Sequence, residues 1–273
     1  NLSNLGFEEK KLTTFKKWIN QPYGMIIISG PTGSGKSTTL YAALQEIHSE
    51  GINITTVEDP VEYQLPGINQ VQMHDEIGLN FAASLRSILR QDPDVLLIGE
   101  IRDEETANIA VKFSMTGHLV FSTVHANDAT STIARLLDLG IPPFLLGSSL
   151  NLVMAQRLVR TIDKDNKESY SPTKDELDLI SFPKDKQKSA KFFRGVPNRD
   201  NHNTGYKGRT AIHEILEVDN PMKKLIFDGA NQNEIKKEAI KNGMTPLRDA
   251  GISKIESGDT TIEEVLRATV EDI

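Results

Sequence analysis

Three glycines, a lysine and a serine stand at a fixed spacing between residues 30 and 37. The segment Gly30-Pro-Thr-Gly-Ser-Gly-Lys-Ser37 has the pattern Gly-x-x-x-x-Gly-Lys-Ser, which is typical of a loop that holds the phosphates of a nucleotide. Glycines let backbone N–H groups close around a phosphate, Lys36 adds a cation, and the Ser37 hydroxyl can ligate Mg²⁺. We therefore expect a nucleoside triphosphate with Mg²⁺ to bind at Gly30, Pro31, Thr32, Gly33, Ser34, Gly35, Lys36, Ser37 and Thr38.

An acid follows the apolar run Val95–Ile98, with one glycine between them. Glu100 would therefore stand at the carboxyl end of a buried strand, where ligands bind in open α/β sheets. There it would polarise the attacking water, hold the metal, or do both. Many enzymes with such a loop carry the metal-binding Asp one position earlier, which here is Gly99. The alternative is that Glu100 only caps a helix.

Two further acids and two histidines stand at the ends of other expected strands. Glu58 and Asp59 could hold metal-bound water or orient a nucleophile, but an ordinary Asp-Pro turn explains them equally well. His118 and His125 bracket a later strand and could sense the γ-phosphate, although a lone histidine is more often structural. The HExxH pattern is absent, so the sequence does not indicate a zinc hydrolase.

Strands and helices must alternate to bring these residues together, and the sequence predicts that alternation. Short apolar runs predict buried strands, and apolar residues at helical spacing predict helices. We expect strands at Met25–Ser29, Ile52–Val57, Val95–Ile98 and Leu119–Val124, and helices at Glu8–Asn20, Ser37–Ser49 and Phe81–Leu89. Two more helices should begin at caps on Asp103 and Asp128 and stop at Gly117 and Gly140. The pattern predicts an α/β fold with a mainly parallel sheet covered on both faces.

The composition narrows the class of protein. Apolar residues make up 38% and charged residues 25% of the 273 residues, as in globular proteins. The net charge of −7 gives no reason to expect nucleic acid as the main partner, and the absence of cysteine excludes disulfides and thiolate metal sites. No apolar run approaches the roughly 20 residues that span a bilayer. The chain starts without methionine or a signal peptide, so we expect a fragment of a longer protein.

The motifs taken together resemble those of one family in order and spacing. They are the phosphate-binding segment, VEDPVEYQLPGINQVQ (57–72), LRSILRQDPDVLLIGEIRD (85–103), TGHLVFSTVHANDA (116–129), AQRLVR (155–160), TGYKGR (204–209) and the final GMTPLRDAGISKIESGDTTIEEVLRAT. The chain resembles the C-terminal ATPase domain of the secretion ATPases, which drive type II secretion and type IV pilus assembly. The resemblance covers nearly the whole chain and is weakest across residues 161–203.

The resemblance implies a RecA-like P-loop core and roles for the acids and histidines. Glu58 and Asp59 form the Asp box of that family, Glu100 the Walker B acid, and His118 and His125 the His box. The ligands it implies are ATP and Mg²⁺. Three arginines could contact phosphate or a neighbouring subunit, or form salt bridges on a helix face: Arg86, Arg90 and Arg102.

The resemblance also implies partners and a location. Family members form ring hexamers and couple ATP hydrolysis to subunit rotation. They work in the cytoplasm beside the inner membrane, where they dock on a platform protein and associated assembly proteins. An N-terminal domain of the same chain completes their nucleotide cleft, so this chain alone should bind nucleotide weakly and hydrolyse it slowly.

Three regions are expected along the chain. They are a RecA-like core at residues 1–160, an inserted subdomain at 161–206 and a C-terminal strand and helical region at 207–273. Retraction motors of pili generally lack the inserted segment, so the resemblance favours an assembly motor. The alternatives are a retraction motor and a nucleotide-binding docking module that does not turn over as an isolated fragment.

The inserted subdomain departs from the family pattern. Many assembly-type members bind zinc there through two CxxC pairs. In this chain Asp163, Asn166, Asn198 and Asn201 stand at the positions of those cysteines. Such side chains cannot replace a thiolate cage. We therefore expect no structural zinc, with the subdomain held by packing or left mobile.

Overall fold

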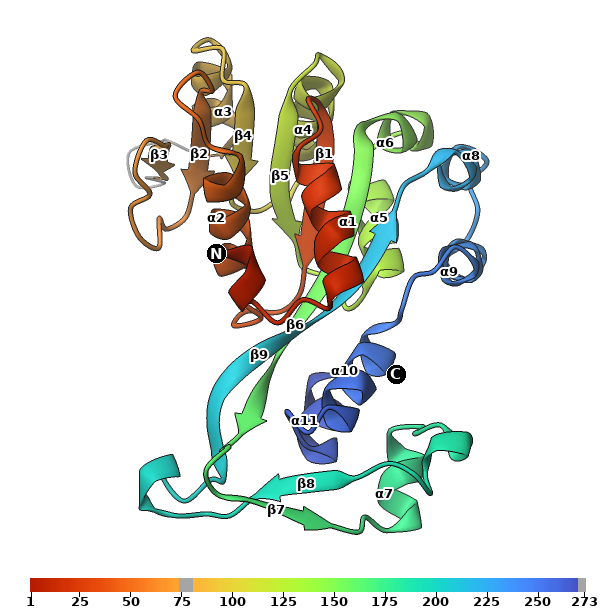
Figure 1. Cartoon of the computed structure of the whole chain (residues 1–273). Coiled ribbons are helices and arrows are strands. Elements are labelled where there is room, and N and C mark those ends of the chain that lie inside the picture. Colours follow the sequence, from red (N-terminus) through yellow and green to blue (C-terminus); the bar gives the residue numbers. More distant parts are fainter. Residues whose placement is uncertain (74–80, 270–273) are drawn as a thin grey trace.

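A seven-stranded sheet in the order β3-β2-β4-β5-β1-β6-β9 forms the centre of this computed structural model, which describes residues 1–73 and 81–269 (Figure 1). The strands are β1 (Gly24–Ser29), β2 (Ile54–Glu58), β3 (Asn69–Gln72), β4 (Val95–Ile98), β5 (Leu119–Val124), β6 (Leu150–Ile162) and β9 (Tyr206–Glu217). All neighbours pair in parallel except β6 and β9, which are antiparallel. The loops that follow β1, β2, β4 and β5 therefore meet at one edge of the sheet.

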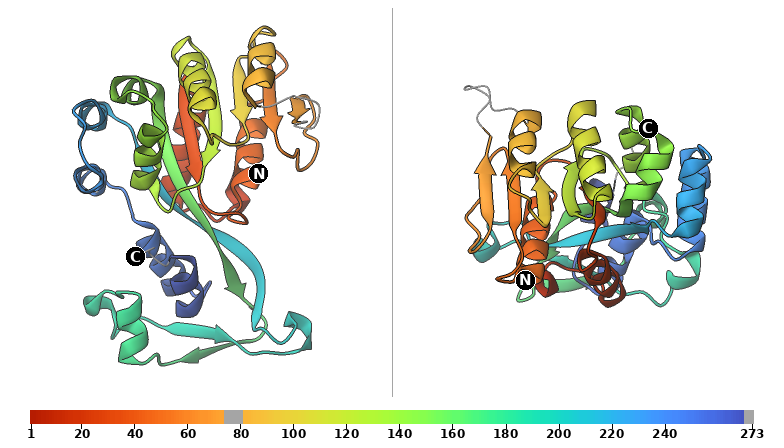
Figure 2. Two further views of the ribbon diagram at one scale, coloured as in Figure 1. Left: turned by 180° about the vertical axis from the view of Figure 1, so that it is seen from behind. Right: turned by 90° about the horizontal axis from the view of Figure 1, so that it is seen from above.

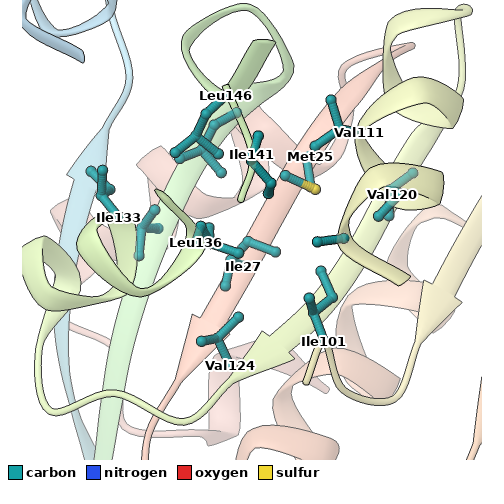
Figure 3. Close-up of a cluster of buried hydrophobic side chains, with 14 of the residues drawn as sticks. Met25, Ile27, Ile101, Val111, Val120, Val124, Ile133, Leu136, Ile141 and Leu146 are labelled. Atoms are coloured by element: carbon teal, nitrogen blue, oxygen red, sulfur yellow. The ribbon is translucent and has the colours of Figure 1, made fainter. Parts of the chain in front are cut away.

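Helices cover both faces of this sheet (Figure 2). The central strand β1 is buried along its whole length, and its side chains alternate between the faces. Ile26 and Ile28 pack against α1 (Glu9–Ile19) and α2 (Lys36–Ile47). Met25 and Ile27 belong to the cluster on the other face, which Figure 3 shows between β1, β5, α4, α5 and α6. A continuous apolar strand thus separates two cores.

The remaining helical elements lie before the first strand, between the strands and after the last strand. They are η1 (Leu2–Asn4), α3 (Phe81–Leu89), α4 (Glu104–Met115), α5 (Ala129–Asp138), α6 (Pro143–Ser149), α7 (Lys174–Leu179), η3 (Lys184–Lys186), η4 (Arg199–Asn201), α8 (Asn220–Phe227), α9 (Gln232–Lys241), α10 (Leu247–Glu256) and α11 (Ile262–Ala268). None of the helices in the described part of the chain has both the length and the apolar character needed to cross a membrane.

The predicted α/β fold with a mainly parallel sheet is confirmed. The ranges predicted for β4, β5 and α3 coincide with those observed. The predicted caps are present: Asp103 accepts a hydrogen bond from Thr106 N at 2.7 Å, and Asp128 accepts one from Ser131 N at 2.8 Å. Local capping chemistry therefore fixed where these helices begin.

Four predicted elements differ from the observed ones by one or two residues at an end, among them the helix at Glu8–Asn20 (observed at Glu9–Ile19) and the strand at Met25–Ser29 (observed at Gly24–Ser29). The helix expected at Ser37–Ser49 begins at Lys36 and ends at Ile47, because His48 has extended backbone angles. The strand expected at Ile52–Val57 runs from Ile54 to Glu58. The strand begins and ends where its pairing with the neighbouring strands begins and ends. Its first residue pairs with β4 and its last residue pairs with β3.

Beyond the sheet, β6 and β9 continue as a two-stranded ribbon to a second small sheet (Figures 1 and 2). That sheet is formed by β7 (Lys167–Tyr170) and β8 (Phe192–Gly195). Phe182 and Phe192 of this segment pack in one cluster with Ile252 of α10 and Val265 of α11. The inserted segment is therefore held by packing, and the boundary expected at residue 160 falls inside β6.

Candidate active site

The phosphate loop, residues 30–38, runs from the end of β1 into α2. Gly33 and Gly35 have φ angles of +82° and +83°, which residues with side chains rarely adopt, so both positions favour glycine. The Lys36 ammonium donates a hydrogen bond back to the Gly30 carbonyl. The loop thereby closes on itself at the N-terminus of a helix, where the backbone N–H groups and the helix dipole favour an anion.

The groups of the phosphate loop fit a phosphate ligand. The Ser34 hydroxyl oxygen is buried and has no hydrogen-bond partner among the residues that the structure describes. A Cβ at Gly30 would lie 2.5 Å from that oxygen, so glycine keeps the space beside it open. Burial lowers the pKa of Lys36, an effect that the Glu100 carboxylate opposes and the Arg157 charge reinforces. A buried hydroxyl without a partner and a desolvated ammonium are groups that a phosphate would satisfy.

Glu100 follows β4 at the edge of the sheet that carries the phosphate loop, and two side chains contact its carboxylate. Oε1 is 3.0 Å from Nε2 of His125, and Oε2 is 3.3 Å from Nε of Arg102. The Glu100 side chain is 21% exposed, so it is held on both oxygens and still reaches solvent. A Cβ at Gly99 would lie 3.2 Å from the Cα of Glu58 on β2. This close approach favours glycine at the position where many related loops have a metal-binding Asp.

The two acids at the end of β2 have different surroundings. Glu58 is 5% exposed, the Tyr41 hydroxyl donates to its Oε1, and the Thr56 hydroxyl donates to its Oε2 at 2.7 Å. Burial and the Glu58 carboxylate raise the pKa of Tyr41, so its hydroxyl keeps the donated proton. Asp59 is exposed and lines a pocket of about 80 Å³ together with Glu58 and Ser37. The structure thus brings both acids beside the expected Mg²⁺-binding hydroxyl, with Asp59 the more accessible of the two.

The two histidines lie at opposite edges of the sheet. His125 follows β5 and contacts Glu100. His118 precedes β5, and an extended strand of six residues separates the two by about 20 Å. The His118 ring stacks on Phe113 with centroids 4.0 Å apart, and its Nδ1 lies 3.1 Å from the Thr116 hydroxyl. The structure brings only His125 to the phosphate loop of this chain, and a catalytic role for His118 stays a prediction.

The three arginines singled out in the sequence are dispersed. Arg86 of α3 forms an ion pair with Glu105 of α4, which joins two neighbouring helices. Arg102 contacts the Glu100 carboxylate. Arg90 is exposed directly after α3. Arg86 therefore forms a salt bridge between two helices, whereas Arg102 belongs to the candidate active site through its contact with Glu100.

Two side chains of β6 lie beside the phosphate loop. The sequence had predicted no role for either of them. The Gln156 amide donates to the Ser34 carbonyl at 2.9 Å. The Arg157 guanidinium would lie 3.1 Å from a Cβ at Gly30. Both residues come directly after the apolar run 150–155, with Asn151 its one polar member, at the carboxyl edge of a parallel strand. Polar residues at that edge are the signal that could have identified them.

The four positions that the resemblance aligns with zinc-binding cysteines lie together and form a hydrogen-bonded network, which we name the Asp163 cluster. Asp163 Oδ2 accepts from the amides of Asn166 and Asn201, each at 3.0 Å. The Asn198 amide oxygen accepts from the Asn201 N–H at 3.1 Å and caps η4. Among the residues described, no group of three or more histidines or acids is arranged to hold a metal ion. The expected absence of zinc stays a prediction.

The sequence of this chain is similar to those of known proteins. It matches the family described as "Type II/IV secretion system protein" over residues 1–267. It is 51% identical over 274 residues to the type IV pilus assembly ATPase PilB of Myxococcus xanthus, covering 100% of this chain and 48% of that protein. It is 47% identical over 271 residues to the type II secretion system ATPase E of Vibrio cholerae, covering 99% and 53%. The chain thus spans about half the length of these relatives.

Two solved structures of other proteins have a similar fold. The pilus retraction motor PilT with bound ADP matches with a TM-score of 0.74 and 26% identity, covering 99% of this chain and 67% of that one. The ATPase DotB of Legionella pneumophila matches with a TM-score of 0.71 and 21% identity, covering 97% and 64%. The second similarity concerns the fold alone.

Proposed function

The chain belongs to the type II/IV secretion system protein family, and we propose that it hydrolyses ATP to drive the assembly of a type IV pilus or of a type II secretion pseudopilus. The observation that carries the proposal is the convergence of Lys36, Ser37 and Glu100 at one edge of the sheet. The names of the two relatives, an assembly ATPase and a secretion ATPase, support it.

In this proposal the phosphate loop binds the triphosphate of ATP. Its backbone N–H groups and the Lys36 ammonium contact the phosphate oxygens. Burial strengthens that attraction, because charges interact more strongly where water is excluded. The buried Ser34 hydroxyl donates to a phosphate oxygen and gains the partner that it otherwise lacks among the described residues. Ser37 and Glu100 would hold Mg²⁺, which when bound neutralises charge on the phosphates.

Glu100 is the residue that we assign to the attacking water. Its carboxylate accepts a hydrogen bond from that water and orients it toward the γ-phosphate. His125 and Arg102 each contact one carboxylate oxygen, so they fix the rotation of the group. Asp59 faces the same pocket as a second acid, whereas Glu58, held by two hydroxyls, keeps the end of β2 in place.

Assembly is favoured over retraction by the degree of similarity. The chain is 51% and 47% identical to proteins named for pilus assembly and type II secretion, and 26% identical to the retraction motor PilT. The inserted segment with β7, α7 and β8 is consistent with the same choice.

We further propose that the chain is the C-terminal motor region of a longer protein that works as a homohexamer. Its coverage of about half of each relative supports the proposal that it is part of a longer protein. Proposed partners are an N-terminal region of the same protein, an inner-membrane platform protein and cytoplasmic assembly proteins, reached from the cytoplasmic side. The regions 1–160, 161–206 and 207–273 are proposed as its core, insertion and C-terminal part. Nucleic acid is not a proposed partner, given the net charge of −7.

Substitution of Glu100 by Gln tests the proposal. Glutamine keeps the shape of the side chain but orients water poorly, so ATP turnover should fall on the order of 100-fold or more. Binding of ADP, measured by calorimetry, should persist. Turnover is measured at high protein concentration, where subunits can associate. Unchanged turnover in the variant would remove Glu100 from the mechanism, and ADP binding without turnover by the unsubstituted chain would favour the docking module.

A further inference from the structure

Gln156 is a buried polar side chain that the proposed mechanism does not use. It is 1% exposed and lies on β6 beside the phosphate loop. Its Nε2 donates to the Ser34 carbonyl at 2.9 Å, and its Oε1 accepts from the Thr39 hydroxyl at 2.8 Å. One amide thus joins β6 to the phosphate loop and to the first turn of α2.

The orientation of this amide is fixed by its partners. The Ser34 carbonyl can only accept a hydrogen bond, so the NH₂ group of Gln156 must face it. The amide oxygen then faces Thr39, whose hydroxyl must donate. The reverse orientation would place two acceptors against each other in a buried position and leave the carbonyl without a donor. The Ser34 carbonyl therefore sets the orientation of the amide, and the Thr39 hydroxyl, which can donate or accept, adapts to it by donating.

The hydrogen bond to Ser34 also fixes the direction of an N–H group in the phosphate loop. In a trans peptide the C=O and the N–H point in opposite directions, and the Ser34 carbonyl shares its peptide with the Gly35 N–H. Because the carbonyl is held toward β6, the Gly35 N–H points away from β6. A Cβ at Gly35 would lie 2.8 Å from the Gln156 amide nitrogen, so the loop rests directly on this side chain.

We propose that Gln156 is a positioning residue that sets the direction of the Ser34–Gly35 peptide before nucleotide binds. The inference rests on the proposed nucleotide binding and adds a residue that acts through the loop without touching the ligand. A loop whose N–H group is already oriented loses less conformational entropy on binding. Gln156 therefore contributes to nucleotide affinity, and the chemistry at Glu100 proceeds without it.

The test replaces Gln156 by Met, which keeps the volume and removes both hydrogen bonds. The Kd for ADP should rise on the order of 10-fold, and KM for ATP should rise with it while kcat changes less than twofold. Thr39→Val should raise the Kd less than Gln156→Met does, and adding it to Gln156→Met should have no further effect, because the partner is already gone.

The matched control is Asn151→Leu on the same strand. Asn151 is buried and donates to the Tyr23 carbonyl at 2.8 Å, at the opposite end of the part of β6 that pairs with β1. Both variants should lower the melting temperature, but only Gln156→Met should weaken ADP binding. Equal ADP affinity in Gln156→Met and the unsubstituted chain would overturn the inference, and so would equal weakening in Asn151→Leu. An unsubstituted chain that does not bind ADP would overturn the proposed function itself.

Discussion

The phosphate loop and the Asp163 cluster use similar chemical groups in opposite ways. Each region contains a buried side-chain oxygen and a buried side-chain amide: Ser34 and Gln156 at the phosphate loop, and Asp163 and Asn201 in the Asp163 cluster. In the phosphate loop, the Ser34 hydroxyl has no partner in the described part of the chain, and burial lowers the pKa of Lys36. In the Asp163 cluster, the Asp163 carboxylate accepts three hydrogen bonds, from two side-chain amides and the Asp165 N–H.

This difference separates a binding site from a structural site. A buried polar group that lacks a protein partner costs free energy until a ligand supplies one. A cluster whose polar groups already have hydrogen-bond partners within the fold does not bear this cost, so it stabilises the folded chain without a ligand. Changes in the phosphate loop should therefore alter ligand affinity more than stability, and changes in the Asp163 cluster should do the reverse.

Lys36→Ala should give the largest effect on affinity. Loss of the ammonium removes a charge-assisted contact to phosphate, so ADP affinity should fall on the order of 100-fold. Because burial lowers the pKa of Lys36, the fold disfavours its charged form. The melting temperature without nucleotide should therefore stay equal or increase. Calorimetry with ADP and thermal unfolding measure the two quantities, and a large fall in melting temperature would contradict the comparison.

Glu264 of α11 combines features of both regions. It is fully buried and accepts from the Arg160 N–H at 2.6 Å and from Arg267 Nε at 3.0 Å. Arg267 also lines a pocket with Thr32 and Gly33 of the phosphate loop. Burial alone would raise the pKa of Glu264, but hydrogen bonds from Arg267 and Arg160 outweigh it and lower this pKa to about 2. Glu264 is therefore saturated like Asp163 yet close to the loop.

Glu264→Gln should destabilise the chain by about 3 kcal/mol at pH 7 and leave ADP affinity unchanged. The carboxylate contributes its stability fully above its ordinary pKa of 4.5 and loses it as the pH falls toward 2. The difference between variant and unsubstituted chain in urea unfolding should thus shrink below pH 4.5. A fall in ADP affinity equal to that of Lys36→Ala would place Glu264 functionally with the phosphate loop.

The features predicted correctly from the sequence depend on near neighbours along the chain. The strand–loop–helix arrangement around residues 30–37, the β4 and β5 strands and the caps at Asp103 and Asp128 each follow from a few consecutive residues. The separation of His118 from His125 also follows from the chain alone, because a strand of six residues holds its ends apart.

The features that were missed depend on contacts between distant residues. Gln156 meets Ser34 across 122 residues, and Tyr41 donates to Glu58 from a different element. Glycine is favoured at position 99 because the backbone of β2 lies close to it, and no local sequence pattern reveals that contact. Neither spacing nor periodicity encodes these contacts, since they arise only when the strands take their order in the sheet.

Asp163→Asn should lower the melting temperature of the chain and leave ADP affinity unchanged. The added amide would face those of Asn166 and Asn201, so donors would oppose donors. Hydrogen bonds from Asn166 and Asn201 lower the pKa of Asp163, so its contribution is present above the ordinary value of 3.8 and is lost as the pH falls below it. Thermal unfolding at pH 7 and below pH 3.8 measures this. A melting temperature equal to that of the unsubstituted chain at pH 7 would refute the structural role.

Addition of zinc should have the smallest effect, because the Asp163 carboxylate already accepts three hydrogen bonds and the other side chains of the cluster are amides. Its carboxylate is occupied by amide donors, and Asn side chains bind zinc weakly compared with thiolates. Zinc should leave the melting temperature unchanged, and metal analysis should find none. A variant with cysteine at 163, 166, 198 and 201 should instead bind about one zinc ion per chain and lose stability with a chelator. Stoichiometric zinc in the unsubstituted chain would show that the cluster is a ligand site like the phosphate loop, and the comparison would fail.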